Sequence, residues 1–131
     1  CHDLKSKLEE MSRQAGFITK TACGQGQEFQ VLNRIMIEEL EAWFFGDIEA
    51  LCQAYAGVRS NLAQKAQYRD PDAIQGGTCE ALQRELQRAG YFKGGLDKVK
   101  AAREIAQFMN PEVNRSPSFQ SFRQGLLEMT S

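Results

Sequence analysis

The chain has 131 residues, the size of one domain, and this is enough to bury about two thirds of the surface that the unfolded chain would expose. A composition of 42% apolar and 25% charged residues, with a formal net charge of −1, argues against a disordered chain. The longest apolar run is too short to span a bilayer, so no membrane partner is expected. We therefore expect a soluble, cytoplasmic protein.

Cysteine and histidine are too sparse to predict a structural metal site. The four cysteines are spread along the chain without a C-x-x-C pair, and His2 is the only histidine. We expect reduced thiols that pack as small apolar groups. A single terminal histidine also gives little basis for a Ser-His or Cys-His nucleophilic mechanism.

The N-terminal third is predicted to contain one helix and a β-hairpin. An amphipathic helix is expected from its apolar spacing, with Asp3 as its cap and Gly16 at its end. The runs "FITKT" (17–21) and "FQVLNRIMI" (29–37) are rich in β-forming residues, and the glycines of "ACGQGQ" between them suit a turn.

Turn and capping residues predict helices along the rest of the chain. The expected caps are Asp47, Asp70, Thr78 and Ser116, and one further helix is expected from Leu96 to Met109. The last helix is expected to bury a stripe of Phe119, Phe122, Leu126 and Met129.

These elements predict an α/β fold dominated by about five to six helices. A lone two-stranded hairpin is only marginally stable, so we expect it to form the edge of an incomplete sheet whose other strands precede residue 1. The chain is interpreted as one domain and as a fragment. Residues 1–46 would hold the first helix, the hairpin and an acidic helix, and 47–131 a helical extension.

The stretch "EELEAWFFGD" (38–47) sets four carboxylates around three aromatic residues. On a regular helix at about 100° per residue, one arc would face the core, formed by Ile37, Leu40, Trp43 and Phe44. Glu38 and Glu41 would lie about 60° apart and converge on one cation. Glu39 and Glu41 would lie about 160° apart, too far to bind the same ion.

Two interpretations of this stretch stay open from the residues alone. Its carboxylates either hold Mg²⁺ or Mn²⁺, or they form the solvated edge of an amphipathic helix. Phe45 discriminates a site from a surface for partner docking, because helical geometry places it between Glu38 and Glu41. Burial of Phe45 would put the acids in a partly covered cleft, whereas exposure in a large apolar patch would favour partner docking.

Charge is distributed unevenly along the chain. Six acidic residues and one basic residue lie between Glu28 and Ala50, whereas eight basic and four acidic residues lie between Arg84 and Gln124. The segment "FKGGLDKVKAAR" (92–103) brings basic side chains near two glycines and a helix start, where they can contact phosphates. An exposed basic helix face explains the same pattern.

Four segments, in this order, resemble the second half of an uncharacterised bacterial family: "RIMIEELEAWFFGD", "DPDAI", "GYFKGGLDKVKAAREIA" and "NRSPSFQSFRQGL". That family is catalogued as a domain of unknown function and is regarded as Toprim-like, akin to the nuclease domain of overcoming-lysogenization-defect proteins. The most specific element is the pattern E-x-E-A-W-x-x-x-D, which this chain meets with Glu39, Glu41, Ala42, Trp43 and Asp47.

The resemblance implies a Mg²⁺- or Mn²⁺-dependent nuclease or phosphotransfer protein that acts with an ATPase partner. Toprim folds hold their metal with a glutamate and an Asp-x-Asp pair that this chain lacks, so the resemblance implies a C-terminal part that is inactive by itself. By resemblance Glu41 and then Glu39 would be the catalytic residues, whereas the helix geometry favours Glu41 with Glu38 as metal ligands. Lys98, Arg103 and Arg115 would contact the nucleic-acid backbone.

The rival hypothesis is a non-catalytic protein–protein interaction module. In that case the carboxylates only edge a helix, and aromatic side chains build a core and a docking surface. These aromatic residues are Trp43, Phe44, Phe45, Phe119 and Phe122. Substrate, cleavage specificity and oligomeric state are not predicted by either hypothesis.

Overall fold

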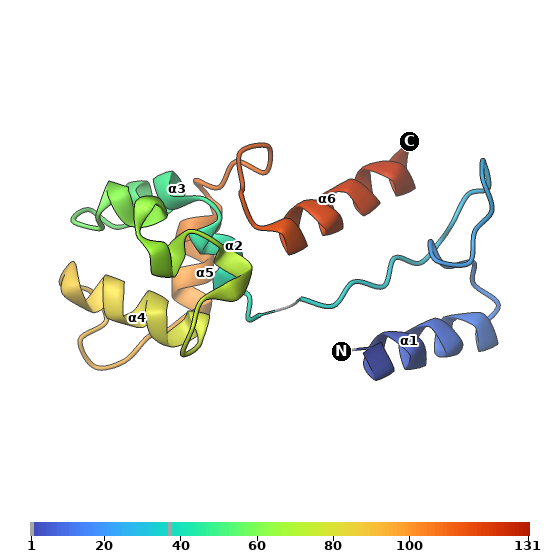
Figure 1. The fold of residues 1–131 in the computed structure, drawn as a ribbon, viewed down its shortest axis with the longest axis horizontal. Coiled ribbons are helices and arrows are strands. Elements are labelled where there is room, and N and C mark those ends of the chain that lie inside the picture. The colour runs from blue at the N-terminus through green and yellow to red at the C-terminus, as the bar shows by residue number, and fades with distance from the viewer. Residues whose placement is uncertain (1, 37) are drawn as a thin grey trace. The chain divides into compact units, whose positions relative to one another are not determined.

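The structure is a computed structural model that describes residues 2–36 and 38–131, and it is helix-rich (Figure 1). The described residues form six α-helices: α1 (His2–Gln14), α2 (Glu41–Phe45), α3 (Ile48–Ala54), α4 (Thr78–Arg88), α5 (Lys98–Ala106) and α6 (Pro117–Thr130). Three short 3₁₀ helices connect α3 to α4: η1 (Ser60–Gln64), η2 (Ala66–Tyr68) and η3 (Pro71–Ala73). Within the described ranges, no helix has both the length and the apolar content to cross a membrane.

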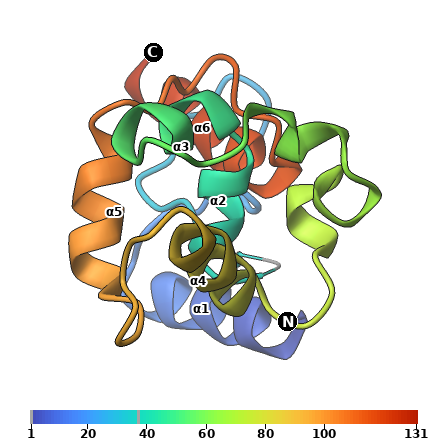
Figure 2. The same cartoon turned by 90° about the vertical axis from the view of Figure 1, so that its left-hand side faces the viewer.

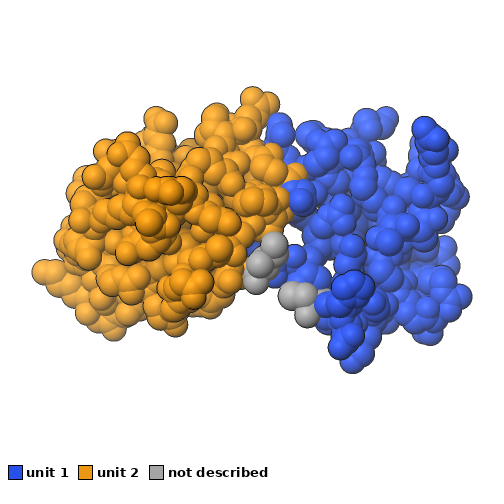
Figure 3. All heavy atoms as spheres, viewed as in Figure 1, with its two compact units in different colours: residues 1–37, 121–131 blue, residues 38–120 orange. Residues whose placement is uncertain are grey.

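The chain divides into two compact units (Figure 3). Unit 1 contains residues 1–37 and 121–131, and unit 2 contains residues 38–120, so α6 contributes to both. This division begins at Glu38 and differs from the one at residues 46 and 47 that the sequence suggested within a single domain. The contacts within the chain thus define two compact units, and the interpretation as a single domain stays a prediction.

Unit 1 has little apolar burial of its own. None of the described residues of α1 is buried, and Leu4 and Met11 of its apolar stripe are more than half exposed. Asp3 lies inside α1 rather than capping it, while Gly16 follows the helix with a φ of 81°, as its predicted role requires. Polar contacts tie the segment after α1 to it, since Asn33 donates to the Glu9 carboxylate at 3.1 Å.

The predicted β-hairpin is wrong, and with it the α/β class. Among the described residues the two runs meet in a single isolated bridge between Thr19 and Val31, of the parallel type. The chain turns at once after Thr19, whose carbonyl oxygen accepts from the amides of Ala22 and Cys23 at 3.1 and 2.9 Å. β-forming residues need a pleated, half-buried surface to pair on, and a single bridge does not provide one.

The hydrophobic core lies in unit 2 around the short helix α2. Helices α3, α4 and α5 and the turn η3 all contact α2, which sits among them (Figure 2). Phe44 and Phe45 of α2 are 4% and 0% exposed, and the Phe45 ring stacks on Tyr68 with centroids 4.9 Å apart. The rest of the core comes from apolar side chains of α3, η1, α4 and α5, including Leu51, Leu62, Leu82, Leu86 and Ile105.

Three predicted caps are confirmed in unit 2. The Asp47 side chain accepts from the Ala50 amide at 3.1 Å and begins α3, and the Asp70 side chain accepts from the Asp72 amide at 3.0 Å before Pro71. The Ser116 hydroxyl accepts from the Phe119 amide at 3.2 Å at the start of α6. The helix predicted from Leu96 is shorter, because Asp97 caps α5 by accepting from the Lys100 amide.

Candidate functional site

The predicted helix through residues 38–47 begins later than the sequence indicated. Helix α2 starts at Glu41, with Leu40 as its cap residue, so Glu38 and Glu39 precede it. Leu40 is 40% exposed rather than on the core arc, Trp43 is half-buried, and Ile37 lies outside the described residues. The angles calculated for a regular helix therefore do not apply to Glu38 and Glu39.

Glu39 is held at the start of α4, about forty residues away in the sequence. Its carboxylate accepts from the Cys79 amide at 2.9 Å and from the Thr78 hydroxyl at 3.4 Å. The prediction that Thr78 caps α4 is wrong, because Thr78 is the first residue of the helix. The cap position is occupied by Gly77, which makes no side-chain hydrogen bond to the helix. Glu39 thus satisfies a free amide of the first turn of α4 from outside the helix.

The Cys79 amide lowers the pKa of the Glu39 carboxyl, and partial burial opposes this while the charge of Lys98 assists it. An ionised carboxylate is the form that an N-terminal helix amide and a nearby ammonium both stabilise. Glu39 is therefore negatively charged at neutral pH.

Lys98, the first residue of α5, joins the two carboxylates of the E-x-E pattern. Its ammonium nitrogen lies 3.5 Å from an oxygen of Glu39 and 3.5 Å from an oxygen of Glu41. The prediction that Glu39 and Glu41 cannot approach one cation is wrong, because Glu39 lies outside the helix. Glu41 is 6% exposed in its side chain, against 45% for Glu39, so this ion pair is partly shielded from water.

The Cys79 side chain lies beside the same ammonium group. Hydrogen bonding to the Cys79 sulfur and then the negative charge of Glu41 raise the pKa of Lys98 above its ordinary value. Burial raises the pKa of the Cys79 thiol, and the contact with Lys98 opposes that rise. The ammonium is thus fully charged at neutral pH, and the thiol is protonated rather than nucleophilic.

These groups border an open depression of about 520 Å³, which we call the acidic hollow. It is lined by Glu39, Leu40, Glu41, Lys98, Val99, Ala102 and Arg103. Glu38 is not part of this lining, and the helical geometry that paired it with Glu41 does not hold because Glu38 precedes α2. Of the residues predicted to contact phosphates, Lys98 and Arg103 are brought together here.

Phe45, which discriminates a site from a surface for partner docking, is fully buried against Tyr68. This is the placement expected when the acids lie in a partly covered cleft. Phe44 is buried as well, and aromatic core residues are also what the docking hypothesis expects. The choice between a site and a docking surface stays a prediction.

A buried polar cluster fixes α2 to the start of α6. The Asp72 carboxylate, 8% exposed, accepts from the Ser116 hydroxyl at 2.7 Å and from the Ser118 amide at 2.7 Å. The Ser118 hydroxyl accepts from the Trp43 indole at 3.0 Å, and the Trp43 ring meets Phe119 edge-on at 5.1 Å. The tryptophan of the E-x-E-A-W pattern thereby orients the helix that carries Glu41.

Asn114 completes this cluster from the loop before α6. Its side-chain amide donates to the Trp43 carbonyl at 2.8 Å and accepts from the Ser116 amide at 2.9 Å. Gly46 leaves the room that Asn114 occupies, since a Cβ at Gly46 would lie 2.0 Å from the Asn114 side-chain oxygen. Sequence reasoning missed Asn114 and Asp72. The "DPDAI" and "NRSPSF" segments carried the signal.

Comparison with known proteins adds one match. A family model described as Domain of unknown function (DUF4276) matches residues 2–127. The chain belongs to this family. No curated protein and no solved structure matches it.

In this DUF4276 chain Arg115 lies apart from the acidic hollow. Its guanidinium donates to the carbonyl oxygens of Arg69 and Phe45 at 3.1 and 3.2 Å, and its amide donates to the Gly46 carbonyl at 2.9 Å. These bonds tie the loop before α6 to α2. A backbone-phosphate contact by Arg115 remains a prediction.

Proposed function

We propose that this chain is the C-terminal part of a Toprim-like, metal-dependent nuclease or related phosphotransfer protein that acts with an ATPase partner. Membership of the DUF4276 family is consistent with this proposal. The observation that carries it is the convergence of Glu39 and Glu41 on one cationic atom in an open hollow bordered by Arg103.

The donor set fits Mg²⁺ or Mn²⁺ as half of a site. Glu39 and Glu41 approach one positive charge from two directions, and hard carboxylate oxygens are the ligands that these ions take. No group of three or more potential metal ligands occurs within the described part of the chain. Such a pair suits an ion that completes its coordination with phosphate oxygens and with other carboxylates.

Each residue of the acidic hollow has a role in this proposal. Glu41, the more buried carboxylate, and Glu39, at the start of α4, would hold the ion. Such an ion would supply Lewis-acid activation of water and charge stabilisation at the phosphate. Lys98 neutralises the two carboxylates when no ion is bound and, with Arg103, supplies positive charge for a phosphodiester backbone.

The test is a cleavage assay on the longest protein that contains these 131 residues, with an ATPase encoded beside it, in Mg²⁺ or Mn²⁺. Glu41→Gln keeps the shape of the side chain and removes its charge. The matched control is Glu49→Gln on α3, where the carboxylate is exposed and accepts from Gln53. We expect at least a hundredfold loss of cleavage in Glu41→Gln and none in Glu49→Gln. Equal cleavage by Glu41→Gln and wild type would remove Glu41 from the mechanism.

A further inference from the structure

Two further depressions adjoin the acidic hollow around α5. A second depression shares Val99 and Arg103 with it, and a third shares Lys100 and Glu104 with the second. Three basic side chains of α5, Lys98, Lys100 and Arg103, line these depressions, and all three are exposed. Six residues of helix separate Lys98 from Glu104, a rise of about 9 Å along the axis of α5.

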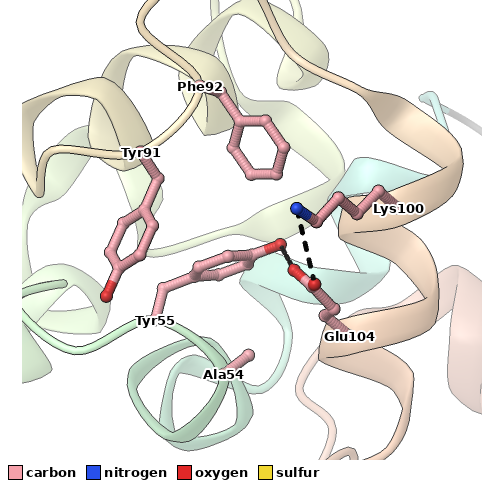
Figure 4. A pocket seen from close by; sticks show the side chains of 6 residues that line it. All are labelled: Ala54, Tyr55, Tyr91, Phe92, Lys100 and Glu104. Atoms are coloured by element: carbon pink, nitrogen blue, oxygen red, sulfur yellow. Dashed lines mark hydrogen bonds and ion pairs between the residues drawn. The ribbon is translucent and has the colours of Figure 1, made fainter.

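The third depression is an aromatic pocket of about 280 Å³, lined by Ala54, Tyr55, Tyr91, Phe92, Lys100 and Glu104 (Figure 4). The buried Tyr55 ring meets Tyr91 at 4.9 Å and Phe92 at 5.7 Å, both edge-to-face. Tyr91 and Phe92 are half-buried, so part of each ring is open to a ligand.

Polar groups stand at the floor and rim of this aromatic pocket. The Tyr55 hydroxyl donates to the Glu104 carboxylate, whose other oxygen lies 4.0 Å from the Lys100 ammonium. Lys100 also lies over the Phe92 ring, 5.8 Å from its centroid (Figure 4). The pocket thus offers ring surfaces, a carboxylate that accepts N–H donors, and an ammonium group that can pair with a phosphate.

Phe92 is held in a backbone conformation that a bulky residue rarely adopts. Its φ is 50°, and among the described residues no other residue except glycine has a positive φ. Its carbonyl oxygen accepts from the Gly95 amide at 2.9 Å and from the Gln87 side chain at 3.1 Å, which fixes this conformation. Glycine would fit here without strain, so the phenylalanine is kept for its ring, which packs against the core beside Tyr55 and lines the aromatic pocket.

We propose that the aromatic pocket binds an unpaired base of a single-stranded nucleic acid, whose backbone follows Lys100, Arg103 and Lys98 toward Glu39 and Glu41. This rests on the proposed function and names the substrate class of the same surface. A base within a duplex has both ring faces covered by its neighbours and cannot enter the pocket, whereas an unpaired base can stack on Tyr91 and Phe92. Its ring N–H or amino groups can donate to Glu104.

The test measures binding alone, with EDTA present, by the fluorescence anisotropy of labelled 12-nucleotide single strands of DNA and RNA and of a blunt duplex. We expect the single strands to bind more tightly than the duplex. Phe92→Gly removes the ring and suits a φ of 50°, and it should weaken single-strand binding about tenfold or more. Because the ring also packs against the core, urea unfolding of the variant checks that it remains folded.

Phe108→Ala is the matched control, because Phe108 is 44% exposed and lines none of the three depressions. It should bind as wild type does. Lys100→Gln should lower affinity and reduce the salt dependence of binding by about one phosphate contact. Tyr91→Leu keeps apolar volume beside Tyr55 but removes the second ring on which a base can stack, so it should also lower the affinity for single strands.

Several outcomes overturn the inference. One is an unchanged affinity of Phe92→Gly for single strands. Another is equal affinity of the wild type for duplex and single strands. The third is that wild type binds neither single-stranded DNA nor single-stranded RNA at low salt. Failure of the proposed function is seen separately. If single strands bind the pocket but Glu41→Gln cleaves as wild type does, this inference is supported and the nuclease proposal is contradicted. If Glu41→Gln loses cleavage but single strands do not bind the pocket, the nuclease proposal is supported and this inference is contradicted.

Discussion

Gly46 is predicted to be indispensable because of the space it leaves rather than its backbone freedom. Its φ of −66° is helical, so alanine would fit the backbone itself. A Cβ at this position, however, would lie 2.0 Å from the Asn114 side-chain oxygen and 2.7 Å from its Cγ. Since Asn114 is 3% exposed, it can relieve this overlap only by leaving its place.

The cost of Gly46→Ala follows from the two hydrogen bonds that Asn114 would give up. These join it to the Trp43 carbonyl and the Ser116 amide, at 2.8 and 2.9 Å. A hydrogen bond contributes about 1 kcal/mol net, and up to about 3 kcal/mol when a buried partner is left unsatisfied. We expect Gly46→Ala to lower the free energy of unfolding by about 2–4 kcal/mol.

A double-mutant cycle isolates this mechanism. In an Asn114→Ala background both the overlap and the hydrogen bonds are already gone. Adding Gly46→Ala there should be neutral, or stabilising by about 0.5–1 kcal/mol because alanine restricts the unfolded chain. Urea unfolding followed by the fluorescence of Trp43, the only tryptophan, measures all four proteins. An equal cost of Gly46→Ala in both backgrounds would refute the steric argument.

Three further predictions concern α4, α5 and the acidic hollow. Burial by itself would raise the pKa of the Glu85 carboxyl, but bonds from Tyr68, Arg59 and Arg88 outweigh it and lower the pKa below the ordinary 4.5. This stabilisation is present above pH 4.5 and is lost as pH falls through the lowered value, so urea midpoints at pH 7 and pH 3 should differ less in Glu85→Gln than in wild type or in Glu80→Gln. Asp97→Ala removes the cap of α5 and should cost about 1 kcal/mol in urea unfolding, whereas Asn61→Ala on η1 should cost less. Lys98→Gln leaves Glu39 and Glu41 without their ammonium partner, so calorimetric titration should show tighter Mn²⁺ binding than in wild type; unchanged affinity would mean that the carboxylates do not form a cation site.

Local signals in the sequence predicted local structure well. Asp47, Asp70 and Ser116 cap their helices because a side-chain oxygen near a helix start acts within three residues. The six α-helices among the described residues also confirm the predicted number of helices. The hairpin failed because strand formation depends on distant pairing partners, which apolar alternation does not reveal.

The geometry of the site was beyond such local reasoning. Periodicity extended the acidic helix back to residue 37, whereas the first helical residue is Glu41. Because Glu39 precedes the helix, its carboxylate and that of Glu41 approach the same cation instead of pointing apart. Glu39 also finds its amide partner at Cys79, and Phe45 finds Tyr68. Such contacts between remote segments become visible only in the folded chain.

The attachment of Glu39 to Cys79 links the surface of the protein to its interior. Thr78, next to Cys79, is fully buried, and α4 continues from there into the core through Leu82 and Leu86. Any ligand that draws the Glu39 carboxylate outward would break its hydrogen bond to the Cys79 amide and so destabilise the first turn of α4. Binding of a ligand in the acidic hollow would then be detected as faster amide hydrogen exchange at Cys79, without a change in the global stability of the protein.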